Sequence, residues 1–155
     1  MLTLTMRPYG DEGDNDAIAH LFNTCAAFDR VDRWMSVNDV RLAFEMPSFD
    51  KTRDMRLWED AEGNLIGMGG MRILESSEEI DASFWFRVHP NASGSELGKQ
   101  IIAWGEQRMR EANPKPGVRV KLLCGSRDDN RRRIALLESC GFKSERFLLD
   151  MERSL

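Results

Sequence analysis

ASFWFRVHPNASGSELGKQIIAW, residues 82–104, is the stretch that decides the fold of this chain. It opens as a mostly apolar run typical of a buried strand, and Gly94 and Gly98 follow in a turn. From Leu97 to Trp104 the apolar residues recur at helical spacing. Glycine lets the backbone approach a ligand closely, and the first amides of a helix point their N–H groups outward. This order favours an anion-binding loop, with an ordinary strand-turn-helix connection as the alternative.

A motif of a known family matches this loop in part. Val88-His89-Pro90 followed by SGSELG at 93–98 resembles motif A of the GCN5-related N-acetyltransferase (GNAT) superfamily, V-x-P and then Arg/Gln-x-x-Gly-x-Gly/Ala. Ser93 replaces the Arg or Gln of the motif, Glu96 replaces its first Gly, and Gly98 matches. The resemblance implies that acetyl-CoA binds here as a cosubstrate.

A second stretch resembles motif B of the same superfamily. NRRRIALLESCGF, residues 130–142, follows the pattern Asn-x-x-Ala-x-x-Leu-Tyr-x-x-x-Gly-Phe without gaps at Asn130, Leu136 and Gly141-Phe142. Leu137 stands where many members have a Tyr, whose hydroxyl can protonate the departing CoA thiolate. A leucine side chain can neither protonate the thiolate nor hold the sulfur by a hydrogen bond.

The order of the expected elements is similar to the GNAT fold over nearly the whole chain. Strands are expected at residues 2–6, 55–60, 65–73, 80–88, 118–124 and 147–151. Helices are expected from residue 14 or 15 onward, from Ser36 to Pro47, from Leu97 to before Asn113, and from Asn130 to Cys140. The resemblance implies one α/β (α+β) domain over residues 1–155. Its mixed, mostly antiparallel sheet would have six to seven strands and about four helices, and its fourth and fifth strands would splay to admit the pantetheine arm.

Three helix starts have candidate caps. Asp14 or Asn15 is expected to cap the first helix, and Asp128 or Asp129 the last. Ser36 is expected to cap the second helix, with Asp39 three residues later as a weak capping box.

The resemblance also assigns residues to the cofactor. Backbone amides on the fourth strand polarise the thioester carbonyl, the loop and helix start contact the phosphates, and the start of the last helix adds polar groups. The cofactor-binding candidates are Phe86, Arg87, Val88, Ser93, Gly94, Ser95, Glu96, Leu97, Gly98, Lys99, Asn130 and Arg133. For the arginines at 131–133, a solvated helix face that answers Asp128 and Asp129 is the alternative interpretation.

Two carboxylates are candidates for the general base. An amine must lose its proton to attack a thioester, and Glu79 and Asp81 lie on or just before the fourth strand. Alternation places them on one face with Ser83 and Trp85, opposite Ile80, Ala82, Phe84 and Phe86. Acidic residues at the start of a strand are also commonly solvated, which is the alternative.

Composition bounds the partners. The chain has 155 residues, 41% hydrophobic and 31% charged, with a net charge of −4, so neither nucleic acid nor an anionic membrane is an expected partner. No stretch approaches the roughly 20 apolar residues of a membrane span, and we expect a cytoplasmic protein. Cys25, Cys124 and Cys140 are scattered and form no metal-ligand spacing, so no metal is expected.

The leading hypothesis is an acyl-CoA-dependent N-acetyltransferase that transfers an acetyl group from acetyl-CoA to a primary amine of a small molecule or peptide. The first alternative is a degenerate GNAT-fold domain that binds CoA or serves as a structural or regulatory half, and the second is a non-catalytic binding module. In general outline the chain also resembles the amino-terminal halves of tandem acetyltransferases of the mycothiol synthase type. That likeness suggests pairing with a second copy in a homodimer, or with a partner domain.

Overall fold

The computed structural model describes residues 3–75, 79–93, 96–112, 117 and 119–145, without the side chains of Glu75 and Glu79. Contacts divide the chain into two compact units, residues 1–125 and residues 126–155. Each unit is described by itself below.

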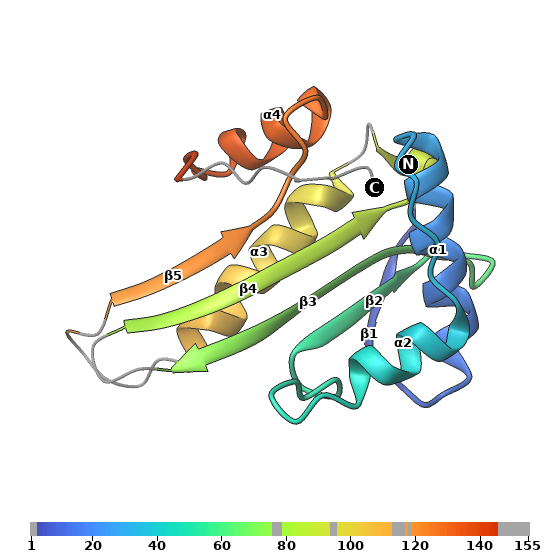
Figure 1. Cartoon of the computed structure of the whole chain (residues 1–155), viewed down its shortest axis with the longest axis horizontal. Helices are drawn as coiled ribbons and strands as arrows, with labels where there is room; N and C mark the ends of the chain where they lie inside the picture. The colour runs from blue at the N-terminus through green and yellow to red at the C-terminus, as the bar shows by residue number, and fades with distance from the viewer. Residues whose placement is uncertain (1–2, 76–78, 94–95, 113–116, 118, 146–155) are drawn as a thin grey trace, which may run out of the picture. The chain divides into compact units, whose positions relative to one another are not determined.

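One five-stranded sheet organises the first unit (Figure 1). Its strands lie in chain order, and neighbours are antiparallel except for the last pair, which is parallel. The strands are β1 (Thr5–Pro8), β2 (Met55–Glu59), β3 (Leu65–Glu75), β4 (Glu79–Val88) and β5 (Arg119–Cys124). The prediction of a mixed, mostly antiparallel sheet is confirmed, and the strand expected at 147–151 lies outside the described residues.

The helices are α1 (Asp14–Phe28), α2 (Val37–Phe44) and α3 (Leu97–Ala112), with a 3-10 turn η1 (Pro90–Ala92), in the first unit and α4 (Arg131–Ser139) in the second. Four α-helices agree with the expected number. The turn η1 was not expected from the sequence.

The two faces of the sheet carry different helices because side chains alternate along each strand. On one face, Leu57 of β2 and Met68 of β3 pack with α1 and α2. On the other face, α3 approaches β3 so closely that a Cβ atom added at Gly69 would lie 2.6 Å from Cγ2 of Ile101. Glycine at this position therefore permits the contact between helix and sheet.

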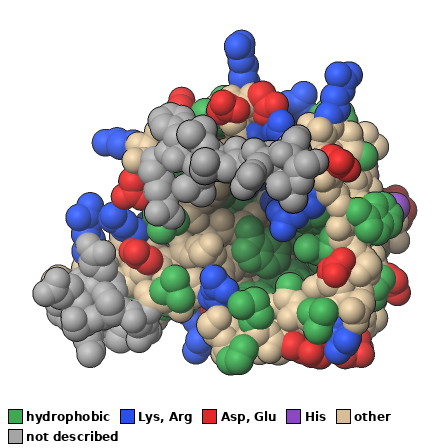
Figure 2. Space-filling view, in the orientation of Figure 1, with side chains coloured by type: hydrophobic (Ala, Val, Ile, Leu, Met, Phe, Trp, Pro, Cys, Tyr) green, Lys and Arg blue, Asp and Glu red, His purple; other side chains and the backbone are tan. Residues whose placement is uncertain are grey.

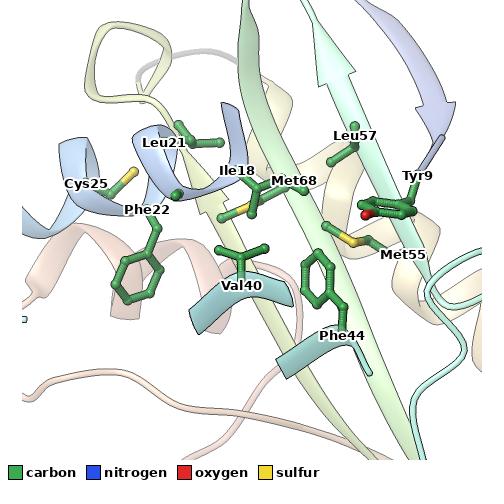
Figure 3. Packing of buried hydrophobic residues seen from close by; sticks show 11 residues of the cluster. Tyr9, Ile18, Leu21, Phe22, Cys25, Val40, Phe44, Met55, Leu57 and Met68 are labelled. Atoms are coloured by element: carbon green, nitrogen blue, oxygen red, sulfur yellow. The ribbon is translucent and has the colours of Figure 1, made fainter. Parts of the chain in front are cut away.

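The hydrophobic core on the α1 and α2 side is shown in Figure 3. Leu21 of α1 and Val40 of α2 are each 1% exposed, and Met55 and Leu57 of β2 are fully buried. The apolar stripes predicted for both helices therefore face the sheet, as amphipathic helices do on a half-buried surface.

The second helix begins as predicted. Oγ of Ser36 accepts from the amide of Asp39 at 3.1 Å, and Oδ2 of Asp39 accepts from the amide of Ser36 at 2.8 Å. This reciprocal pair is a capping box, and it satisfies two amide groups at the start of α2.

The predicted cap of α1 was wrong. Gly13 occupies the cap position and makes no side-chain hydrogen bond. Asp14 is instead the first helical residue and binds the guanidinium of Arg7, with Nη2 and Oδ1 2.7 Å apart. Asn15 is 2% exposed and accepts a hydrogen bond from the Tyr9 hydroxyl at 2.8 Å. Asp14 is thus engaged with β1, and Asn15 with the residue that follows this strand.

The predicted cap of α4 was also wrong by one or two positions. Asn130 is the cap, and its Oδ1 accepts from the amide of Arg133 at 3.2 Å. Asp129 pairs instead with the guanidinium of Arg127 at 3.0 Å. The helix ends before Gly141, whose φ of +92° suits glycine and agrees with the expected stop.

Candidate functional site

The pairing of β4 with β5 ends before β4 does. The parallel register runs from Glu79, opposite Arg119, to Phe84, opposite Cys124. Beyond Phe84, β4 continues to Val88 with β3 as its neighbour. The edge of β4 from residue 85 to 88 therefore extends past the end of β5, as expected where the fourth and fifth strands splay apart, and we refer to this end of their pairing as the opening.

The backbone groups that face this opening follow from the register of β3 and β4. The amide of His89 donates to the carbonyl of Ile66 at 2.8 Å. Hydrogen-bonded pairs alternate along an antiparallel ladder, so Arg87 also directs its backbone toward β3. Phe86 and Val88 consequently direct their amides toward the β5 side.

Cys25 contacts the end of this edge, and sequence reasoning missed it. Its Sγ lies 3.3 Å from the Val88 carbonyl oxygen and donates to it. Cys25 is 6% exposed on the buried stripe of α1. The only signal in the sequence was its helical spacing, which does not reveal a partner 63 residues away.

The segment after β4 is held by local hydrogen bonds. Nδ1 of His89 accepts from the amide of Asn91 at 3.1 Å, and Oγ of Ser93 donates to the Pro90 carbonyl at 2.8 Å. Both side chains thereby stabilise η1. The next two predicted residues, Gly94 and Ser95, lie outside the described residues.

The start of α3 has backbone amides without a partner inside the helix, as the predicted anion site requires. Leu97 and Gly98 are buried, and the first amide bonded within the helix is that of Gln100, which donates to the Glu96 carbonyl at 3.0 Å. Among the described residues, the amides of Gly98 and Lys99 precede this bond and have no partner inside the helix. They add the positive end of the helix dipole to the site.

Two charged side chains flank this helix start. Nζ of Lys99 lies 3.8 Å from Oε1 of Glu96, and the Glu96 side chain is 75% exposed. The carboxylate that replaces a motif glycine therefore points to solvent beside a cation, which reduces its repulsion of a bound phosphate.

In the second unit, the predicted residues serve α4. The side-chain oxygen of Asn130 caps the helix, Arg133 supplies the amide that it binds, and Leu137 is 6% exposed. The cofactor contacts assigned to Asn130 and Arg133 stay predictions.

Asp81, one of the two candidate bases, lies on the predicted face of β4. Ile80, Ala82, Phe84 and Phe86 are all buried on the opposite face, so the alternation is confirmed. Asp81 is half-buried, and its Oδ1 is a buried atom without a hydrogen-bond partner in the described part of the chain. Only the backbone of Glu79 is described.

A cavity of about 290 Å³ lies on this same face, between the sheet and the helices α1 and α2. Its walls are mainly apolar, with Phe22, Val40, Phe44 and Trp85 among them. Among the described residues, its charged groups are three guanidiniums, those of Arg33, Arg72 and Arg87. We call it the arginine cavity. Figure 2 shows this face hollowed, with hydrophobic side chains inside the hollow and Lys or Arg side chains beside it.

The described residues contain neither a cluster of metal ligands nor a helix that could span a membrane. Among them, no three His, Cys, Asp or Glu side chains gather as ligands of a metal ion would. Within the same residues, every helix is too short or too polar to cross a membrane.

The family model for the acetyltransferase (GNAT) family matches residues 15–142. The chain belongs to this family. The match covers both motif-like stretches and all the described strands except β1. The family predicted from the sequence is thus confirmed, whereas the likeness to tandem enzymes and the homodimer stay predictions.

Solved GNAT-fold structures agree with this assignment. A GCN5-related N-acetyltransferase from Sphaerobacter thermophilus superposes with a TM-score of 0.74 at 21% identity, over 90% of this chain and 43% of that one. A Salmonella typhimurium protein solved with its cofactor acetyl-CoA gives 0.62 at 20%, over 90% and 79%. The ribosomal-protein-S18-alanine N-acetyltransferase from Escherichia coli gives 0.65 at 15%, over 93% and 80%.

These identities establish the fold alone. The chain spans less than half the length of the Sphaerobacter protein. Among curated proteins, none is similar enough in sequence to match the chain.

Proposed function

We propose that this GNAT chain is an N-acetyltransferase that transfers the acetyl group of acetyl-CoA to a primary amine of a small molecule or peptide. The observation that carries the proposal is the end of β4 beyond Phe84, where pairing with β5 stops and the β3–β4 ladder directs the amides of Phe86 and Val88 toward the β5 side. Membership in the family supports it, as does the acetyl-CoA bound to the Salmonella typhimurium relative.

The residues present fit acetyl-CoA. We place the extended pantetheine arm beside β4, where its pairing with β5 has ended. The amides of Gly98 and Lys99 supply donors for a phosphate at the start of α3. The Lys99 ammonium, whose side chain is 55% exposed, adds a positive charge at the same end of the helix.

Acetyl-CoA supplies an activated acetyl thioester. The amine nitrogen attacks its carbonyl carbon, a C–N bond forms, and the C–S bond breaks as the thiolate leaves. During this step an amide of Phe86 or Val88 donates a hydrogen bond to the carbonyl oxygen, where negative charge develops. These donors are fixed by the β3–β4 ladder and need no reorganisation.

A base must remove the proton of the amine. We assign this role to Asp81, with Glu79 as the second candidate on the same face. Phe86 lies five positions after Asp81, a distance of about 16 Å along a strand. The proton must therefore pass through water, and the buried, unpartnered Oδ1 of Asp81 is an acceptor for such a relay.

A second candidate function is a degenerate domain that binds CoA without catalysis. The observation that favours it is Leu137, which replaces the motif tyrosine and is 6% exposed. Its apolar side chain cannot protonate a thiolate, so turnover requires water or the acceptor itself to do so.

Calorimetric titration of the chain with acetyl-CoA tests the cofactor, with desulfo-CoA and ATP as competitors. A micromolar dissociation constant, about −8 kcal/mol, is expected. No detectable binding would overturn the proposal. Binding without acetyl transfer to any member of an amine panel would favour the degenerate domain.

Matched variants test the base. Asp81→Asn is expected to lower kcat/KM by about 100-fold, because the relay loses its proton acceptor. Acetyl-CoA affinity is expected to stay unchanged. Glu79→Gln is the matched control, and a large loss in this variant alone would transfer the role to Glu79.

A further inference from the structure

The arginine cavity has the size of a small ligand. Its volume of about 290 Å³ lies just below the range for small-molecule pockets, roughly 300–1,000 Å³. The cavity is lined by Ser83, Trp85 and Arg87, which lie on the same face of β4 as Asp81. It thus adjoins the strand to which we assign the chemistry.

The charge of the cavity is opposite to that of the protein. The whole chain carries a net charge of −4, yet the described charged groups that line this cavity are Arg33, Arg72 and Arg87. They come from the loop after α1, from β3 and from β4, so the fold and not a local sequence run gathers them. Like charges in a half-enclosed space repel one another, and a bound anion relieves this repulsion.

One of these guanidiniums has unused hydrogen-bonding capacity. Nε of Arg72 is buried and has no partner among the described residues, while its Nη1 contacts only the Met46 sulfur, at 3.9 Å. A buried donor without an acceptor is costly, and a carboxylate that accepts from it removes this cost.

The other two arginines are held over an aromatic ring. The Cζ atoms of Arg33 and Arg87 lie 5.7 Å and 5.0 Å from the centroid of the Phe22 ring. Stacking on the ring face leaves the edge of the Arg33 guanidinium available for planar recognition of a carboxylate, whereas Nη1 of Arg87 already donates to the Phe86 carbonyl at 2.8 Å.

The walls select for an apolar body. Phe44 and Trp85 stack with their ring centroids 6.4 Å apart, and Val40, Met68 and Phe49 complete the lining nearby. Burial of a large aliphatic or aromatic group against this surface is favourable, whereas burial of a polar group contributes little binding free energy.

We propose that the acceptor is an amino acid: a primary amine that carries a carboxylate and a bulky apolar side group, both held in the arginine cavity. The inference rests on the proposed function and narrows its substrate class. The guanidiniums bind the carboxylate, and the aromatic walls bind the side group. The amine is left for the edge of β4.

Acceptors that differ in one group test the proposal. L-phenylalanine, L-phenylalaninamide and 2-phenylethylamine share the amine and the ring, but only the first has a carboxylate. We expect kcat/KM for phenylalanine to exceed that for the other two by about 10- to 100-fold, as loss of a charge-assisted hydrogen bond predicts. L-alanine, which lacks the apolar body, is expected to be poorer than phenylalanine by about tenfold or more.

Variants locate the recognition. Arg72→Met is expected to bring the ratio of kcat/KM for phenylalanine to kcat/KM for 2-phenylethylamine close to one. Arg33→Met, in an exposed loop, is expected to lower this ratio without affecting folding. Arg41→Met is the matched control, because Arg41 lies on α2 outside the cavity with a 42% exposed side chain. Calorimetric binding of phenylalanine in the presence of CoA gives a readout independent of turnover, and the same loss is expected there.

The outcomes separate this inference from the proposed function. Equal acetylation of phenylalanine and 2-phenylethylamine, or an unchanged ratio in both Arg72→Met and Arg33→Met, overturns the amino-acid acceptor and leaves the acetyltransferase intact. Exclusive acetylation of peptide amines without a nearby carboxylate does the same. Absence of acetyl-CoA binding overturns the proposed function itself. In that case the calorimetric titration with phenylalanine tests the cavity separately: binding supports an amino-acid ligand there, and no binding overturns it.

Discussion

Nε of Arg108 donates to Oδ1 of Asp54 at 2.7 Å, and the two side chains are only 8% and 5% exposed. The pair ties the last turns of α3 to the residue before β2, 54 positions earlier in the chain. The carbonyl of Asp54 also accepts from the amide of Met71 at 2.9 Å. One buried carboxylate residue thus connects a helix on one face to the sheet that it covers.

Breaking this pair is expected to destabilise the fold strongly. Asp54→Ala removes the buried anion of Arg108 and leaves this guanidinium beside the exposed carboxylate of Glu111, 3.8 Å away. The change is expected to cost about 3–5 kcal/mol of the free energy of unfolding. Urea denaturation measures the loss. Arg110→Met, which removes a 72% exposed arginine of the same helix, is the control and is expected to cost less than about 1 kcal/mol. A similar small cost for Asp54→Ala would show that the pair is solvated.

Overpacking at Gly70 is expected to disturb the arginine cavity. A Cβ atom there would lie 2.3 Å from Cζ2 of Trp85, so Gly70→Ala must displace the indole that lines the cavity. We expect a loss of about 1–3 kcal/mol in denaturant unfolding and a changed tryptophan fluorescence spectrum. Gly125→Ala is the control, because nothing lies within 4 Å of a Cβ atom at that position. Equal stability of the two variants would contradict the close approach.

The stability of the fold is expected to fall in acid partly through Asp14. A hydrogen bond from the Arg7 side chain is the main cause that lowers the pKa of Asp14 below its usual value. A lowered pKa in the folded state means that the ionised carboxylate stabilises the fold. This contribution is complete above the unfolded value of about 4 and is lost as the pH falls through the lower folded value.

Asp14→Asn should therefore cost about 1 kcal/mol at pH 7 and almost nothing near pH 2. Urea unfolding of both proteins across this pH range measures the difference. Asp16→Asn, an exposed change in the same first helical turn, is the control for the helix dipole. A difference between Asp14→Asn and the parent chain that persists undiminished at pH 2 would rule out the ionised pair as its source.

Removal of the cap of α2 is expected to loosen the cavity wall that this helix provides. Ser36→Ala deletes the acceptor of the Asp39 amide and should cost about 1 kcal/mol. Thr24→Ala, which deletes a hydroxyl bonded inside α1, is the control and should change stability by less than about 0.5 kcal/mol. Hydrogen exchange of the α2 amides would locate the effect, and protection equal to that of the parent chain would contradict it.

The sequence predicted what depends on neighbouring residues. The capping box of Ser36 and Asp39, the alternation along β4 and the start of α3 all follow from spacings of two to four residues. The two motif-like segments predicted the family, and they lie at the starts of α3 and α4, where the resemblance places them. Local rules failed at α1, where Arg7 from β1 engages Asp14 and leaves Gly13 at the cap.

The arginine cavity was not predictable in this way. Arg33, Arg72 and Arg87 are separated by 39 and 15 positions, and each alone reads as an ordinary surface charge. The contact of Cys25 with Val88 is equally remote in sequence. Only the register of β3 and β4, together with the packing of α1 and α2, brings these groups together.

The parallel pairing of β4 and β5 has a consequence for how the protein folds. Strands β2 to β4 form a chain-order antiparallel meander, and β1 pairs with β2 across the helices α1 and α2. Strand β5 pairs with residues 40 positions earlier, and only after α3 has crossed the sheet. We expect the meander with α1 and α2 to assemble first during synthesis, and β5 to join last. The arginine cavity would then exist on the nascent chain before the opening for the cofactor does.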